Sequence, residues 1–129
     1  MTREETIAKL RATPSAPTLD ALYSLILDSI ADIQGALTDQ TEESLMADRP
    51  RRRFVERCYE VVSDSVRCLP EAVTANERGI NWLRTAEVGD YLRCEYYQTD
   101  VKRLLSIAAE DLPPLKTFVE RVIDEAKKQ

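Results

Sequence analysis

The sequence lacks histidine altogether and has only three glycines and one tryptophan among its 129 residues. Without histidine, a zinc site of the Cys/His type is excluded, and no imidazole is present to act as a base near neutral pH. The scarcity of glycine argues against a sheet protein, whose turns need glycine, and favours long helices joined by short links. We therefore expect an all-α fold.

Long apolar runs are also missing. No stretch approaches the ~20 apolar residues that span a bilayer, and the first residues, MTREETIAKLRAT, are charged and have no apolar core of the kind found in signal peptides. We therefore expect a cytoplasmic protein without membrane contact. There the three cysteines, Cys58, Cys68 and Cys94, are expected to stay reduced, and none of them forms a Cys-x-x-Cys pair.

The charge balance is acidic, with a net charge of −5. Such a protein does not bind nucleic acid through its overall charge, so RNA binding needs a local basic patch. A dense charge run is usually a solvated helix face, which we favour here over an RNA site. The candidate patch consists of Arg49, Arg51, Arg52, Arg53 and Arg57.

Four glutamates raise the question of a metal site within a helical bundle. They lack the Glu-x-x-His pairs that supply ligands in such sites, because the chain has no histidine. We therefore expect no metal and no cofactor. The glutamates are Glu42, Glu43, Glu56 and Glu60.

Apolar residues recur at steps of three or four, which is the period of one helix face. The pattern predicts an up-and-down bundle of four principal helices with shorter helices around them. Leu19 belongs to the apolar stripe of the first helix, and Phe54 and Cys58 to that of the second. The predicted helices begin after Thr18, span residues 41–47, 51–68 and 82–94, and follow caps at Asp100 and Asp111.

The first residues stand outside this pattern. Thr2 and Glu5 fit a capping box that starts a short helix, and the prolines of TPSAP, residues 13–17, end it. We expect residues 1–17 to be an N-terminal extension and residues 18–129 to form the bundle domain.

Three segments, in this order, resemble the HepT-like branch of the HEPN superfamily. They are RFVERCYE at residues 53–60, Ile-Asn-Trp at residues 80–82 and EDLPPL at residues 110–115. That family consists of small all-helical proteins that partner minimal nucleotidyltransferases in bacterial toxin–antitoxin pairs. The resemblance implies a HEPN-type bundle, a two-fold homodimer whose motif helices form one cleft, and a minimal nucleotidyltransferase (MntA-like) antitoxin as partner.

The family motif is an arginine, four to six residues, a histidine, any residue and a tyrosine, and it aligns with VGDYLRCEYY at residues 88–97. Cys94 stands where the histidine should be, and Tyr96 keeps the tyrosine. Asp90 replaces the usual asparagine, and Gly89 stands where many members carry the arginine. Some members carry an arginine directly before the histidine, a variant that Arg93 resembles. The resemblance therefore makes Arg93, Cys94, Tyr96 and Asp90 the candidate catalytic positions of a degenerate motif.

In the family, the histidine and the arginine are thought to cut RNA without a metal. A thiol, with a pKa of ~8.5, is a poor substitute for an imidazole, with a pKa of ~6.5, and a thiolate adds negative charge beside a phosphate. Asp90 also repels a phosphate, whereas Arg93 keeps the paired N–H groups that bind one. We therefore expect a member that does not cleave RNA and acts by binding its nucleotidyltransferase. Two alternatives stay open, an active ribonuclease that relies on Arg93 and a stand-alone dimeric interaction module.

Each candidate also has a purely structural interpretation. Cys94 is either a nucleophile or a small buried hydrophobe, and we favour burial. In the family the motif tyrosine accepts AMP from the nucleotidyltransferase, which silences the toxin, so the resemblance makes Tyr96 the candidate AMP acceptor. Packing at a helix end explains Tyr96 equally well, and it is the interpretation we favour for Tyr97.

Overall fold

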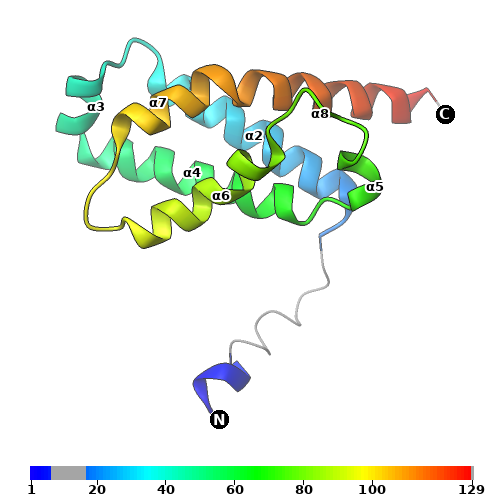
Figure 1. Ribbon diagram of the computed structural model, residues 1–129, viewed down its shortest axis with the longest axis horizontal. Helices are drawn as coiled ribbons and strands as arrows, with labels where there is room; N and C mark the ends of the chain where they lie inside the picture. Colours follow the sequence, from blue (N-terminus) through cyan, green and yellow to red (C-terminus); the bar gives the residue numbers. More distant parts are fainter. Residues whose placement is uncertain (7–16, 129) are drawn as a thin grey trace.

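The computed structural model describes residues 1–6 and 17–128. Throughout these ranges the chain forms helices joined by turns and short links, as predicted (Figure 1). None of these helices has the length and apolar composition that crossing a bilayer requires. After a short helical turn at residues 3–6, the helices are α2 (Leu19–Leu37), α3 (Glu42–Ala47), α4 (Arg49–Arg67), α5 (Glu71–Thr74), α6 (Trp82–Cys94), α7 (Val101–Glu110) and α8 (Leu112–Lys127).

The helix α4 makes the most extensive contacts with other helices of the bundle. It packs against α2 on one side and against α6 on the other, and α2 also packs against α8. In Figure 1, α7 and α8 follow one another along the upper edge, and α4 and α6 lie side by side below them. The all-α fold class predicted from the sequence is therefore confirmed.

Several helix starts have the predicted caps. The Thr18 hydroxyl accepts the N–H of Ala21 at 3.1 Å, and the Asp100 carboxylate accepts the N–H of Arg103 at 3.1 Å. The predicted capping box between Thr2 and Glu5 is also present. The predicted helix break at residues 13–17 lies, up to residue 16, outside the described residues.

Asp111 occupies the N-cap position of α8, but its side chain does not cap the helix. Its backbone N–H bonds to the carbonyl of Ile107, so α7 leads almost directly into α8. The carboxylate turns instead to α6, where Oδ2 lies 2.9 Å from Nε of Arg84. Burial raises the pKa of Asp111, and Arg84 opposes that rise. The predicted cap was wrong because an ion pair with another helix takes the carboxylate.

The core contains two departures from the predicted stripes. Phe54 is 48% exposed and Leu19 is 38% exposed. Each helical residue turns about 100° from the one before it. The buried positions Val55 and Cys58 therefore leave Phe54 at the rim, and Leu19 is only the first residue of α2. Tyr59, which the pattern did not single out, is fully buried, and its hydroxyl donates to the carbonyl of Leu104 at 2.6 Å.

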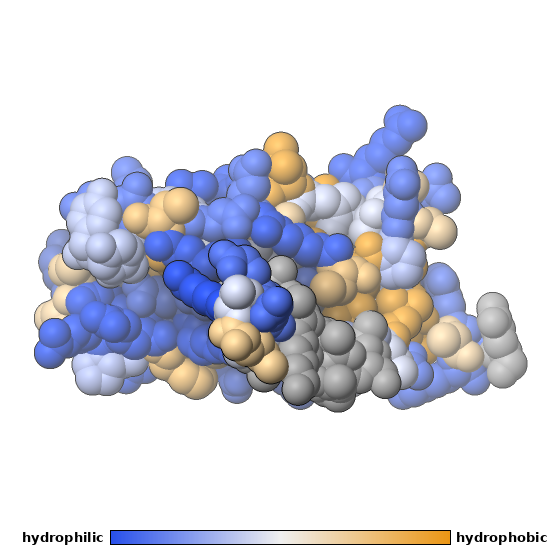
Figure 2. Space-filling model, turned by 90° about the horizontal axis from the view of Figure 1, so that it is seen from below, coloured by the Kyte–Doolittle hydropathy of each residue, from blue (hydrophilic) through white to orange (hydrophobic). Residues whose placement is uncertain are grey.

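Exposed hydrophobic side chains are unevenly distributed over the surface. Figure 2 shows that hydrophobic residues on the face seen from below gather toward the right-hand end, which is the α5 end in Figure 1. The remainder of that face is mostly hydrophilic. The large hydrophobic residues with substantial exposure in the bundle, apart from two tyrosines, are Leu19, Leu25, Met46, Phe54 and Leu83.

Candidate functional site

The predicted motif lies at the C-terminal end of α6 and in the turn that follows. The helix begins at Asn81, whose side chain accepts the N–H of Arg84 at 3.0 Å, and it ends at Cys94. Tyr96 and Tyr97 lie in the turn with exposed fractions of 82% and 68%. Their rings meet edge to face at a centroid distance of 5.7 Å. Both phenols therefore project from the surface of the bundle and take no part in its core.

Cys94 is exposed, so the prediction that it is a small buried hydrophobe was wrong. The helix α6 buries the face that carries Val88 and Leu92. Cys94 follows Leu92 by two residues, which places it about 200° around the helix, on the opposite side. Cys68 is also exposed, whereas Cys58 is buried and has its pKa raised by that burial.

Asp90 and Arg93 belong to a chain of ion pairs that joins α6 to α4. Arg67, the last residue of α4, donates from its two terminal nitrogens to the two carboxylate oxygens of Asp90, at 3.2 Å for Oδ1. Arg93 donates to the same Oδ1 at 2.6 Å. The other terminal nitrogen of Arg93 lies 3.8 Å from Asp64 of α4. Arg93, the residue expected to bind a phosphate, thus has two carboxylates as neighbours.

The charge state of Asp90 follows from these contacts. Hydrogen bonds from Arg67 and then Arg93 lower the pKa of Asp90 to about 2. Asp90 is therefore ionised near neutral pH and offsets the charge of the guanidinium groups around it. The four side chains are 39% to 59% exposed, so water screens these pairs and each contributes little to stability.

Gly89 lies where α4 and α6 approach each other closely. A Cβ atom at this position would lie 2.6 Å from Oγ and 3.0 Å from Cβ of Ser63. The Ser63 hydroxyl donates to the carbonyl of Ala86 at 2.5 Å and accepts the N–H of Gly89 at 3.2 Å. The family resemblance aligns Gly89 with the arginine of the motif. An arginine does not fit between these helices as they are packed. The packing of the two helices therefore favours glycine at this position.

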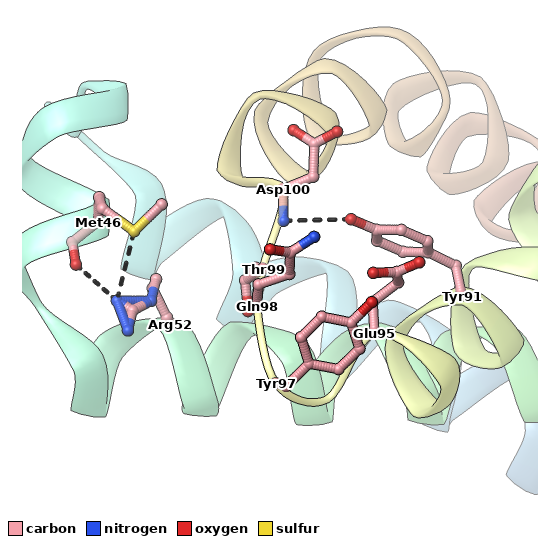
Figure 3. Close-up of a pocket in the computed structure, with 8 residues that line it drawn as sticks. All are labelled: Met46, Arg52, Tyr91, Glu95, Tyr97, Gln98, Thr99 and Asp100. Atoms are coloured by element: carbon pink, nitrogen blue, oxygen red, sulfur yellow. Dashed lines mark hydrogen bonds between the residues drawn. The ribbon is translucent and has the colours of Figure 1, made fainter.

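The turn that carries the two tyrosines is fastened at its far end. The Thr99 hydroxyl donates to the carboxylate of Glu56 on α4. The backbone N–H of Asp100 donates to the Tyr91 hydroxyl at 3.1 Å (Figure 3). The guanidinium of Arg103 lies over the Tyr91 ring, 4.1 Å from its centroid. These contacts tie residues 99–103 to both α4 and α6.

A pocket of about 610 Å³ opens beside this turn, between it and the start of α4 (Figure 3). It places one guanidinium, that of Arg52, together with the carboxylates of Glu95 and Asp100. This mixture of charges does not favour an anion over a cation. The lining residues are Met46, Arg52, Tyr91, Glu95, Tyr97, Gln98, Thr99 and Asp100.

The predicted arginine cluster serves partly to hold helix ends. Arg51 donates to the carbonyl of Ala36 at 2.8 Å, near the end of α2. Arg52 donates to the carbonyl of Met46 at 2.5 Å, near the end of α3. Cations stabilise the negative C-terminal ends of helices, which explains both contacts. Arg57 pairs with Glu60 at 3.3 Å on the exposed face of α4, as expected for a solvated charge run.

Two residues of the ion-pair chain, Asp64 and Arg67, were not singled out from the sequence. No local signal marked them out, since Asp-x-x-Arg occurs four times, at residues 48–51, 64–67, 90–93 and 100–103, and the two pairs at 64–67 and 90–93 lie on α4 and α6. The spacing puts both side chains of each pair on one helix face, and the packing of α4 against α6 brings the two pairs together. Within residues 1–6 and 17–128, no group of three or more Cys, Asp or Glu side chains is arranged to hold a metal ion.

Comparison with known proteins links the chain to ribonucleases. A family model described as Ribonuclease HepT-like matches residues 26–122. A protein of Methanocaldococcus jannaschii, named "Gamma-glutamylcyclotransferase and putative RNase", is 26% identical over 103 residues, which cover 80% of this chain and 46% of that protein. The matched stretch thus spans about half the length of this curated relative. No solved structure matches the chain.

Proposed function

The chain belongs to the HepT-like ribonuclease family, and from this premise we propose that it is a toxin–antitoxin component whose RNA-cutting chemistry is impaired. The observation that carries the proposal is the state of the motif positions. An exposed thiol, Cys94, stands where the resemblance expects an imidazole, and the neighbouring Arg93 is paired with two aspartates. The site therefore has no group suited to proton transfer near neutral pH and a guanidinium that is already engaged.

An assay of metal-free RNA cleavage tests the impairment. The purified protein is compared with Cys94→His, which restores the missing imidazole, and with Cys68→His, which adds an imidazole at another exposed cysteine. We expect no cleavage by the parent or by Cys68→His, and measurable cleavage by Cys94→His. Cleavage by the parent in the presence of a metal chelator would show that its chemistry is intact.

An active ribonuclease is the second candidate function. It is favoured by the arrangement of Arg93, Cys94 and Tyr96, which are all exposed at one end of α6. The name of the Methanocaldococcus jannaschii relative also includes an RNase. If the parent cuts RNA and Arg93→Ala abolishes cutting while the fold is unchanged, this candidate replaces the first.

We propose a minimal nucleotidyltransferase as the partner and Tyr96 as the residue that it modifies with AMP. An exposed fraction of 82% leaves the Tyr96 phenol open to a modifying enzyme. Mass spectrometry after co-expression with a minimal nucleotidyltransferase is expected to find adenylate on Tyr96. Tyr97→Phe should keep the adduct and Tyr96→Phe should lose it. Both phenols are exposed, so the comparison tests the position of the tyrosine and not its accessibility. An adduct that persists in Tyr96→Phe would reject this residue as the acceptor.

We also propose that residues 18–129 form the functional domain as a two-fold homodimer and that residues 1–17 are an extension. The exposed apolar side chains Leu25, Phe54 and Leu83 offer surface that a second copy could bury. Deletion of residues 1–17 is expected to leave the protein dimeric in solution and its melting temperature unchanged. A monomeric mass for the full chain at micromolar concentration would contradict the dimer. This outcome would favour a different partner for the apolar surface.

A further inference from the structure

We infer that Arg67 and Arg93 form a phosphate-binding site that the protein keeps filled with its own Asp90 carboxylate. The inference rests on the proposed function for its choice of ligand, the backbone phosphate of RNA, and it identifies the group that competes with this ligand. Asp90 then acts as an internal competitor at the candidate site.

The geometry of the three side chains supports this view. Arg67 presents two terminal nitrogens to the two oxygens of Asp90, and Arg93 presents one more to Oδ1, at 2.6 Å. Guanidinium groups bind carboxylates and phosphates through the same paired N–H contacts. The Asp90 carboxylate therefore occupies the place in which two arginines from different helices would converge on a phosphate.

The surrounding charges single out Asp90 as the competitor. Asp64 lies 3.8 Å from Arg93 and is 59% exposed, so its hold on that guanidinium is looser than that of Asp90. Glu87, one turn earlier on α6, acts on Arg67 only as a nearby negative charge. Removing the charge at Asp90 should thus take the hydrogen-bonded carboxylate from both guanidinium groups and leave Asp64 as a looser neighbour, whereas removing it at Glu87 should leave both groups paired with Asp90.

Binding of a short single-stranded RNA, labelled and followed by fluorescence anisotropy at low salt, tests the inference. Asp90→Asn keeps the side-chain shape and removes the charge, and Glu87→Gln is the control with the same change in net charge. We expect Asp90→Asn to bind about tenfold more tightly than the parent, because a negative charge within a few ångströms of the phosphate is lost. Glu87→Gln should stay within about twofold.

The gain must also depend on both arginines. In the Asp90→Asn background, Arg67→Ala and Arg93→Ala are each expected to return the affinity to that of the parent. The salt dependence of binding should steepen in Asp90→Asn and flatten again in the double variants. Asp90→Ala removes the same carboxylate and should therefore also bind RNA more tightly than the parent. Circular dichroism of each protein verifies that the bundle is folded.

The outcomes separate this inference from the proposed function. Equal gains in Asp90→Asn and Glu87→Gln would overturn the inference, since net charge alone would explain them. If Asp90→Asn binds inorganic pyrophosphate more tightly through Arg67 but binds RNA no better, the two-arginine site stands and RNA as its ligand is rejected. If Cys94→His cleaves RNA while Asp90→Asn alters neither pyrophosphate nor RNA binding, the inference fails and the proposed function stands.

Discussion

Replacing Gly89 by alanine tests the close packing of α4 against α6. The new methyl group would lie 2.6 Å from Oγ and 3.0 Å from Cβ of Ser63, both well inside the ~3.5–4.0 Å of ordinary carbon contacts. The helices must then separate or Ser63 must change its rotamer. Overpacking of this kind costs about 1–3 kcal/mol.

A second glycine provides the matched control. Gly35 lies in α2, is exposed, and has no atom within 4 Å of the position that a Cβ would take. Gly→Ala in a helix interior gains up to about 1 kcal/mol from propensity alone. Gly35→Ala should therefore stabilise the protein by about 0.5–1 kcal/mol, the lower figure because the site is near the helix end. Gly89→Ala should fall about 1–3 kcal/mol below Gly35→Ala, since it has the same propensity gain and an added clash.

Urea unfolding followed by circular dichroism at 222 nm, a helix signal, measures both variants. Ser63→Ala completes a double-mutant cycle, because it removes the closer of the two contacting atoms. The loss caused by Gly89→Ala should shrink by about 0.5 kcal/mol or more when Ser63 is already alanine. Equal stabilisation by Gly89→Ala and Gly35→Ala would refute the close approach of the helices. It would also remove the reason why this position cannot carry arginine.

Three further predictions concern single groups. The Asp90 carboxylate should titrate near pH 2 in carbon-detected NMR, and it should titrate at a higher pH in Arg67→Ala. Since the folded pKa lies below the unfolded value of ~3.9, the stabilisation from Asp90 is complete above about pH 4 and is lost as the pH falls through about 2. Tyr59→Phe should cost about 1 kcal/mol in urea unfolding, because the buried hydrogen bond to the Leu104 carbonyl is lost. Cys94 should react with an aromatic disulfide reagent in the native protein, whereas the buried Cys58 should react only on unfolding.

Each of these has a clear contrary result. An Asp90 midpoint that Arg67→Ala leaves unchanged would mean that the ion pair is absent in solution. If Tyr59→Phe unfolds at the same urea concentration as the parent, the hydrogen bond of the Tyr59 hydroxyl to Leu104 contributes no more to stability than its bond to water in the unfolded chain. In the native protein we expect two thiols, those of Cys68 and Cys94, to react rapidly. Slow reaction of Cys94 would show that a second copy or another segment covers it.

The sequence predicted helices well where the signal is local. The third long helix was predicted at residues 82–94 and is observed as Trp82–Cys94, with Asn81 as its cap. Apolar spacing alone was less reliable at the edges of each stripe. Phe54 adjoins buried Val55 in sequence but lies on the rim, because one residue turns the helix by about 100°.

The surroundings of the candidate site depended on tertiary packing and were therefore harder to predict. Cys94 is hydrophobic enough for a core but lies opposite Leu92 on α6, and the orientation of α6 decides which of these two faces is buried. The contact of Arg67 with Asp90 joins residues 23 apart in the chain, so no local rule could identify it. The motif positions themselves came from a family resemblance, and their roles stay predictions.

The fastening of the turn after α6 has a consequence for recognition. Ordering a flexible backbone costs roughly 1–2 kcal/mol per residue, and a partner that binds a loose loop must supply that free energy. Here the contacts of Thr99 with Glu56 and of Asp100 with Tyr91 meet this cost when the bundle folds. A protein that docks on Tyr96 and Tyr97 would need to restrict only their side-chain rotamers, and a group attached to either phenol would extend into water without disturbing the helices beneath.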